Sequence, residues 1–145
     1  TAVGFQAATA ATSASQLTAI GSQAGNNITS GGTGATVVGY AAGQYAGSYL
    51  TAVGRAAGQN NSGVNNTAVG YGAFQQDNSG TGNTAIGYIA LNASNSSTNN
   101  TGVGASVLKA ITTGNGNTAV DEAQRIGSND DFLTAIESMK STAVR

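Results

Sequence analysis

One short repeat, Thr-x-(Val/Ile), recurs along nearly all of the chain and limits what the chain can fold into. The motif threonines are Thr1, Thr18, Thr36, Thr51, Thr67, Thr84, Thr101 and Thr118, so the units are 15–18 residues long. Gly follows the Val or Ile in seven of the eight units, and Ala holds the seventh position in six. A unit this short, and this rich in Gly and Thr, does not suit a helical hairpin repeat. It suits one coil of a parallel β-solenoid.

The segments between motifs have the composition of turns. Stretches such as GQNNSGVNN (58–66) and QQDNSGTGN (75–83) consist almost entirely of Asn, Gly, Ser, Gln and Thr. These residue types tolerate left-handed backbone angles and form local hydrogen bonds. We therefore predict one short strand at each motif and a second short strand or extended run near its seventh and eighth positions. Coils stacked about 4.8 Å apart would form a rod roughly 35–40 Å long.

The two faces of the motif strand are both uncharged. In an extended segment Thr67 and Val69 share one face, while Ala68 and Gly70 share the other. Strands with small or apolar groups on both faces are usually buried on both. One face would fill the coil, and the other would need a partner, which predicts an oligomer. We expect the third-position residues to stack as the structural core of the repeat: Val3, Ile20, Val38, Val53, Val69, Ile86, Val103 and Val120.

The composition argues against several kinds of chemistry. The chain has no Cys and no His, which excludes disulfides, thiolate nucleophiles, imidazole bases and nearly all structural zinc sites. Its net charge is −1 without a basic cluster, so nucleic-acid binding is not expected. No segment reaches the roughly 20 apolar residues of a membrane span. We expect no cofactor and no metal ion.

Paired carboxylates, which glycosidases use, are also not expected in the repeats. Of the six acidic residues only Asp77 lies there; the others stand in the C-terminal part, namely Asp121, Glu122, Asp130, Asp131 and Glu137. A solvated, capping role suits those five better than catalysis. We therefore expect that the chain is not an enzyme.

The residue after the motif Gly forms a column of varied type: Phe5, Ser22, Tyr40, Arg55, Tyr71, Tyr88 and Ala105. This variety predicts a corner or surface position. Tyr40, Tyr71 and Tyr88 are the candidate contact residues. They have two interpretations: the rings shield the strand edge, or they form a stacking platform for sugar rings.

The composition changes near the C-terminus, so we divide the chain into a repeat domain, 1–124, and a capping or trimerisation segment, 125–145. In one interpretation this segment contains a helix that begins at a capping box of Ser128 and Asp131. Its apolar face would hold Phe132, Ile136, Met139 and Ala143, and three such helices would form a short coiled coil. In the alternative, residues 133–136 belong to a ninth, degraded coil. Either would cap the solenoid.

The strings NNTAVGYGAF, GNTAIGYIAL and NNTGVGASVL resemble the head repeats of trimeric adhesins. They are still more similar to the GNTAVGYxAL-type repeats of bacteriophage tail fibres and other virion fibres. The resemblance covers residues 1 to about 124 and implies an all-β fold, a left-handed parallel β-roll in a homotrimer. Asn precedes the motif Thr only from Asn66 onward, whereas Leu17, Ala35 and Leu50 stand there earlier. The first half is therefore expected to pack differently or to contact something apolar.

The resemblance implies a structural and adhesive segment of a virion fibre, most simply a tail fibre, that attaches the particle to its host. The implied partners are two further copies of the chain, other virion proteins and a glycan or protein receptor on the host cell, without membrane insertion. The implied location is the extracellular virion. Alternatives are a capsid fibre, the head of a bacterial trimeric autotransporter adhesin on the cell surface, or a non-catalytic part of a glycan-degrading tailspike.

Overall fold

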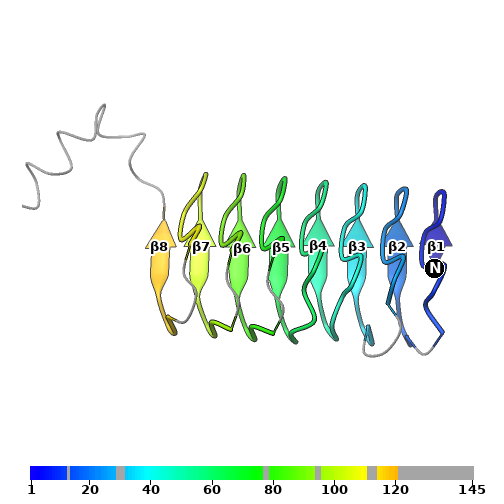
Figure 1. Ribbon diagram of the computed structural model, residues 1–145, viewed down its shortest axis with the longest axis horizontal. Coiled ribbons are helices and arrows are strands. Elements are labelled where there is room, and N and C mark those ends of the chain that lie inside the picture. Colours follow the sequence, from blue (N-terminus) through cyan, green and yellow to red (C-terminus); the bar gives the residue numbers. More distant parts are fainter. Residues whose placement is uncertain (13, 29–31, 77–78, 94–95, 111–113, 121–145) are drawn as a thin grey trace, which may run out of the picture.

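The computed structural model describes residues 1–12, 14–28, 32–76, 79–93, 96–110 and 114–120. These residues form an all-β, parallel β-solenoid with no helix in the described ranges, which confirms that part of the predicted fold class. Eight strands lie side by side in chain order in a single sheet (Figure 1). They are β1 (Ala2–Val3), β2 (Thr18–Ile20), β3 (Thr36–Val38), β4 (Thr51–Val53), β5 (Thr67–Val69), β6 (Thr84–Ile86), β7 (Thr101–Val103) and β8 (Thr118–Val120). The segment 125–145, with its helix prediction, lies outside the described residues.

Neighbouring strands pair motif to motif. Thr67 is opposite Thr84 and Val69 is opposite Ile86, and the same register holds from β2 to β8. It holds for the longest unit, between β2 and β3, and for the shortest, between β3 and β4. The turns therefore absorb every difference in unit length, and the strands keep identical residues stacked.

The motif Gly is required by backbone geometry. Gly54 has φ +130°, a conformation that residues with a side chain rarely adopt. A Cβ atom at Gly54 would lie only 2.6 Å from the carbonyl oxygen of Gly70 in the next coil. The Gly columns of successive coils are therefore in backbone contact, and any side chain there would separate the coils.

The predicted second strand near the seventh and eighth positions is wrong. Those residues form turns in each of the seven coils where the structure describes them, and the eighth position is left-handed even where it is not glycine, with φ +52° at Phe74 and +46° at Leu91. A run with such angles cannot be a strand. It still bonds to the next coil, since Phe74 N–H donates to Ala90 C=O at 2.9 Å. The second wall of the solenoid is therefore built from stacked turns.

The interior is filled by the second position of the motif, not the third. Ala19, Val37, Ala52, Ala68 and Ala85 are fully buried. The eight Val and Ile residues that we expected to form the repeat core lie on the outer face of the sheet, half-buried or exposed, with Val53 40% and Ile86 39% exposed. Within one chain that predicted role does not hold. Large side chains from elsewhere in the coil, such as Leu50, Phe74 and Leu91, already occupy the interior and leave room only for a small second-position residue.

The two halves of the solenoid fill their interiors differently, as the change at Asn66 predicts. Leu50 is buried before β4, and its coil has Gly58 at the eighth position. A Cβ at Gly58 would lie 3.1 Å from Leu50 Cδ2, so glycine there makes room for leucine. In the next coil the arrangement is reversed: Asn66 precedes the strand and Phe74 fills the eighth position.

The asparagines before β5 to β8 form a hydrogen-bonded ladder. Asn83 Oδ1 accepts the backbone N–H of Asn100 at 2.9 Å, and Asn100 Oδ1 accepts that of Asn117 at 2.8 Å. Each side-chain amide of Asn66, Asn83 and Asn100 also donates to a backbone carbonyl of the turn that precedes the next strand, at 2.7–2.8 Å. The ladder begins beside Asn61, whose Oδ1 accepts from Asn66 Nδ2. These buried amides satisfy backbone groups that no strand pairing reaches.

A second amide ladder lies on the turn side. Gln59 Nε2 donates to Gln44 Oε1 at 3.0 Å, and Gln75 Nε2 donates to Gln59 Oε1 at 2.8 Å. Both ladders depend on identical coil positions being stacked, so they reinforce the register set by the strands.

Candidate functional site

The candidate contact residues lie together at the corner where each strand ends. Tyr40, Tyr71 and Tyr88 directly follow the motif Gly of β3, β5 and β6, and their side chains are 49%, 46% and 55% exposed. Arg55 holds the same position after β4 and is also exposed. Because the strands are in register, the four side chains form one column along the solenoid. We call these four residues the aromatic column.

Arg55 links two of the tyrosines. Its guanidinium carbon is 5.6 Å from the centre of the Tyr40 ring and 5.3 Å from the centre of the Tyr71 ring. Its Nη1 also donates to the Tyr71 hydroxyl at 2.9 Å. Cation–π contacts of this kind contribute about 0.5–1 kcal/mol each at exposed positions. The guanidinium is therefore held between the two rings.

Tyr71 also stacks on Tyr88. Their ring centres are 5.4 Å apart and their planes are inclined by 18°. One face of Tyr71 is therefore directed to Arg55 and the other to Tyr88. A platform for sugar rings needs open aromatic faces, and the inner faces of this column already contact one another. Tyr71 therefore offers a partner its ring edges and hydroxyl group, and Arg55 offers the outer edge of its guanidinium.

Two exposed tyrosines outside this column were not singled out from the sequence. Tyr45 and Tyr49, in the turns between β3 and β4, are 50% and 57% exposed. They have no counterpart in later coils, so no periodicity marked them. The ring of Tyr49 lies over Gly34, where a Cβ atom would approach Tyr49 Cδ1 to 2.8 Å. Tyr49 therefore packs on a turn of its own solenoid.

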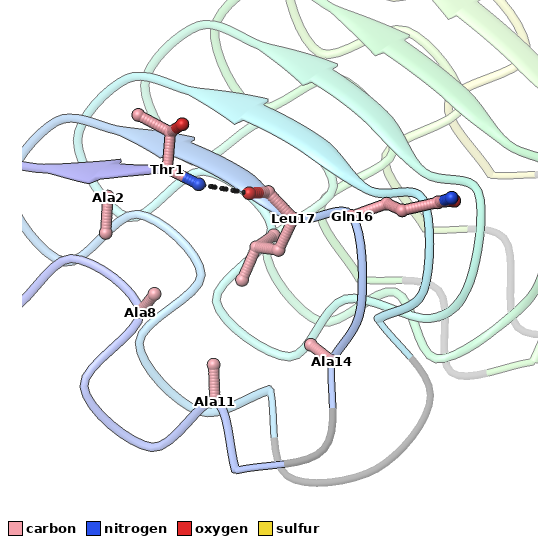
Figure 2. Close-up of a pocket in the computed structure, with 7 residues that line it drawn as sticks. All are labelled: Thr1, Ala2, Ala8, Ala11, Ala14, Gln16 and Leu17. Carbon is pink, nitrogen blue, oxygen red and sulfur yellow. Dashed lines mark hydrogen bonds between the residues drawn. The ribbon is translucent and has the colours of Figure 1, made fainter.

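A pocket of about 330 Å³ opens at the β1 end of the solenoid (Figure 2). Its lining includes Ala8, Ala11 and Leu17, which pack against the apolar core, and no charged side chain. The backbone nitrogen of Thr1 donates to Leu17 C=O at 2.7 Å, in the place where Thr18 N–H donates to Ala35 C=O in the next coil. The pocket is the interior space of the first coil, and its residues carry no chemistry that would recognise a ligand.

Groupings that would hold a metal ion are not found among the described residues. The described ranges likewise contain no helix of the length and apolarity needed to cross a membrane. The aromatic column is therefore the surface with the clearest recognition chemistry in the described part of the chain.

Comparison of the chain with protein-family models, with curated proteins and with solved structures finds no match.

Proposed function

We propose that this chain is a structural and adhesive segment of a bacteriophage virion fibre, most simply a tail fibre. In this proposal three copies form a rigid shaft or head that attaches the particle to its host. The chain acts mechanically and by binding, and it catalyses no reaction. The observation that carries the proposal is the apolar outer face of the sheet.

This outer face runs along all eight strands. Every strand presents its Val or Ile there, and none of them is fully buried within one chain. The motif threonines share this face, and no charged residue interrupts the motif strands. Continuous apolar surface of this length on a protein marks a contact with another molecule. Identical ladders on identical chains favour a symmetric assembly, and the resemblance to trimeric fibre repeats supports three chains.

The remaining surface suits a fibre exposed to its surroundings. The turns are neutral and rich in Asn, Ser, Thr and Gly, and the aromatic column lies beside the strands. Hydroxyl, amide and aromatic groups are the side chains with which proteins contact glycans and other proteins through hydrogen bonds and ring packing. A host glycan or protein receptor is therefore the proposed external partner, and other virion proteins are the proposed partners along the fibre axis.

Solution mass tests the assembly. We expect multi-angle light scattering of the 145-residue chain to give about three times the 14.1 kDa of one chain. Val69→Lys introduces a charge on the outer face and is expected to lower that mass, because a charge buried between chains without a partner is costly. Gln76→Lys introduces the same charge at an exposed turn position and should leave the mass unchanged. A folded monomer, or a Val69→Lys protein with the mass of the unmodified chain, would contradict the proposed assembly.

Attachment is tested separately. The fluorescently labelled assembly is mixed with intact cells of a panel of bacterial strains and separated by centrifugation. Saturable binding to some strains and not to others supports a receptor-binding role. Absence of saturable binding to every strain would leave only the structural role.

A further inference from the structure

The charge of Arg55 is unusual for this solenoid. Residues 1–117 contain only three charged side chains, Arg55, Asp77 and Lys109. In the other six units that carry the motif Gly, the same column position holds an uncharged residue, such as Ser22 or Tyr40.

The guanidinium is also held in place. It lies between the rings of Tyr40 and Tyr71 and donates one hydrogen bond to the Tyr71 hydroxyl. A guanidinium carries five N–H donors in a planar fork, so most of its donors are not used by this bond. Arginine that is already positioned loses less conformational freedom on binding than a freely rotating side chain. The neighbouring hydroxyl groups of Tyr71 and Tyr88 add donors to the same exposed strip.

We propose that Arg55 and the adjoining tyrosines bind an oxyanion, a carboxylate or a phosphate, carried by a bacterial surface polysaccharide. This inference rests on the proposed function and names the chemistry of the receptor. The planar fork of arginine matches the two oxygens of such a group. The positive edges of aromatic rings also favour an electron-rich partner. Neutral sugar rings fit less well, since both faces of Tyr71 are already covered by Arg55 and Tyr88.

The test compares two anionic polymers with a neutral ester of one of them. Binding of the full chain is measured by isothermal titration calorimetry with galacturonate oligomers, with their neutral methyl esters and with inorganic polyphosphate. We expect at least one of the two anionic polymers to bind and the methyl ester to bind at least about tenfold more weakly. Binding of only polyphosphate identifies phosphate as the preferred group, and binding of only galacturonate identifies carboxylate.

Lys109→Gln is the matched control for Arg55→Gln, because both remove one positive charge, and Lys109 is an exposed residue outside the aromatic column. We expect Arg55→Gln to weaken anion binding about tenfold or more and Lys109→Gln to change it less than about twofold. Arg55→Lys, which keeps the charge without the fork, should bind more weakly than the unmodified chain. If Arg55→Gln and Lys109→Gln weakened anion binding equally, the effect would come from net charge alone, and the proposed site would be overturned.

Light scattering on the same samples separates the two proposals. If the chain is a trimer and binds the methyl ester as tightly as galacturonate, or binds neither galacturonate nor polyphosphate, the oxyanion site is overturned and the fibre role still stands. A monomer whose anion binding requires Arg55 supports the site and contradicts the assembly.

Discussion

Replacing Asn83 by Ala tests how much the asparagine ladder contributes to stability. Asn83 is 1% exposed, and its Oδ1 is the acceptor for the backbone N–H of Asn100 at 2.9 Å. Alanine leaves that buried N–H without this acceptor, which costs about 1–3 kcal/mol. It also removes the bond from Asn83 Nδ2 to Ser97 C=O at 2.8 Å, worth about 1 kcal/mol. We expect the free energy of unfolding to fall by about 2–4 kcal/mol.

The assay is urea denaturation followed by far-ultraviolet circular dichroism at one fixed chain concentration, because association contributes to apparent stability. Asn117→Ala is the control on the same ladder. Asn117 is exposed, and Asn100 Oδ1 keeps its bond to the Asn117 backbone N–H at 2.8 Å, so a loss below about 1 kcal/mol is expected. Asn83→Leu should lower the free energy of unfolding as much as Asn83→Ala, because leucine also lacks an acceptor for the Asn100 N–H, although Leu50 occupies the equivalent position in an earlier coil. If Asn83→Ala came within about 0.5 kcal/mol of Asn117→Ala, the reasoning about unsatisfied amides would be refuted.

Three further predictions concern single positions. Gly54→Ala places a Cβ atom against the carbonyl oxygen of Gly70 at a residue with positive φ, so we expect the free energy of unfolding to fall by about 3 kcal/mol or more. The same denaturation experiment measures this loss, and an unchanged midpoint would contradict the account of the motif Gly. Asn61 Nδ2 is buried and has no hydrogen-bond partner among the described residues, so removing it offsets the loss of the bond that Asn61 Oδ1 accepts from Asn66 Nδ2; Asn61→Ala should change stability by less than about 1 kcal/mol, and a larger loss would contradict this balance. Deamidation at Asn115-Gly116 requires attack of the Gly116 nitrogen on the Asn115 side chain, and the backbone of Thr98 bonds to both groups, at 2.8 and 3.0 Å. Peptide mass mapping should therefore show deamidation at least about tenfold slower in the folded chain than in urea, and equal rates would contradict this protection.

The architecture could be predicted because the repeat is expressed directly in the sequence. Thr67 to Gly70 recur at nearly constant spacing, and only a stacked solenoid puts such copies in register. The exposure of the aromatic column could also be predicted, since a position that accepts Tyr, Arg and Ser lies at a surface. The contact between Arg55 and two rings could not, because it depends on how side chains of successive coils orient toward one another.

Which face lies inside could not be read from the motif. Alternation separates Ala68 from Val69 but does not say which one is interior, and hydrophobicity alone favours valine. The structure buries Ala68 because Phe74 enters the interior from the opposite turns. Phe74 does so from a left-handed backbone, φ +52°, which residues other than Gly, Asn and Asp seldom adopt. Local propensity therefore gave no sign of that turn, which is repeated in the seven coils whose turn is described and is supported by hydrogen bonds to the next coil.

The sequential order of the sheet determines how the rod responds to tension. Strands that are neighbours in the sheet are also neighbours in the chain, 17 residues apart at Thr67 and Thr84. Pulling a single chain from its two ends would peel off one coil at a time and load only the few hydrogen bonds at the opening edge. Each coil spans about 5 Å along the axis when it is stacked, and nearly 60 Å when it is detached and fully extended. A single solenoid therefore has little resistance to tension along its own axis. A fibre built from such solenoids would have to carry tension through the contacts between chains.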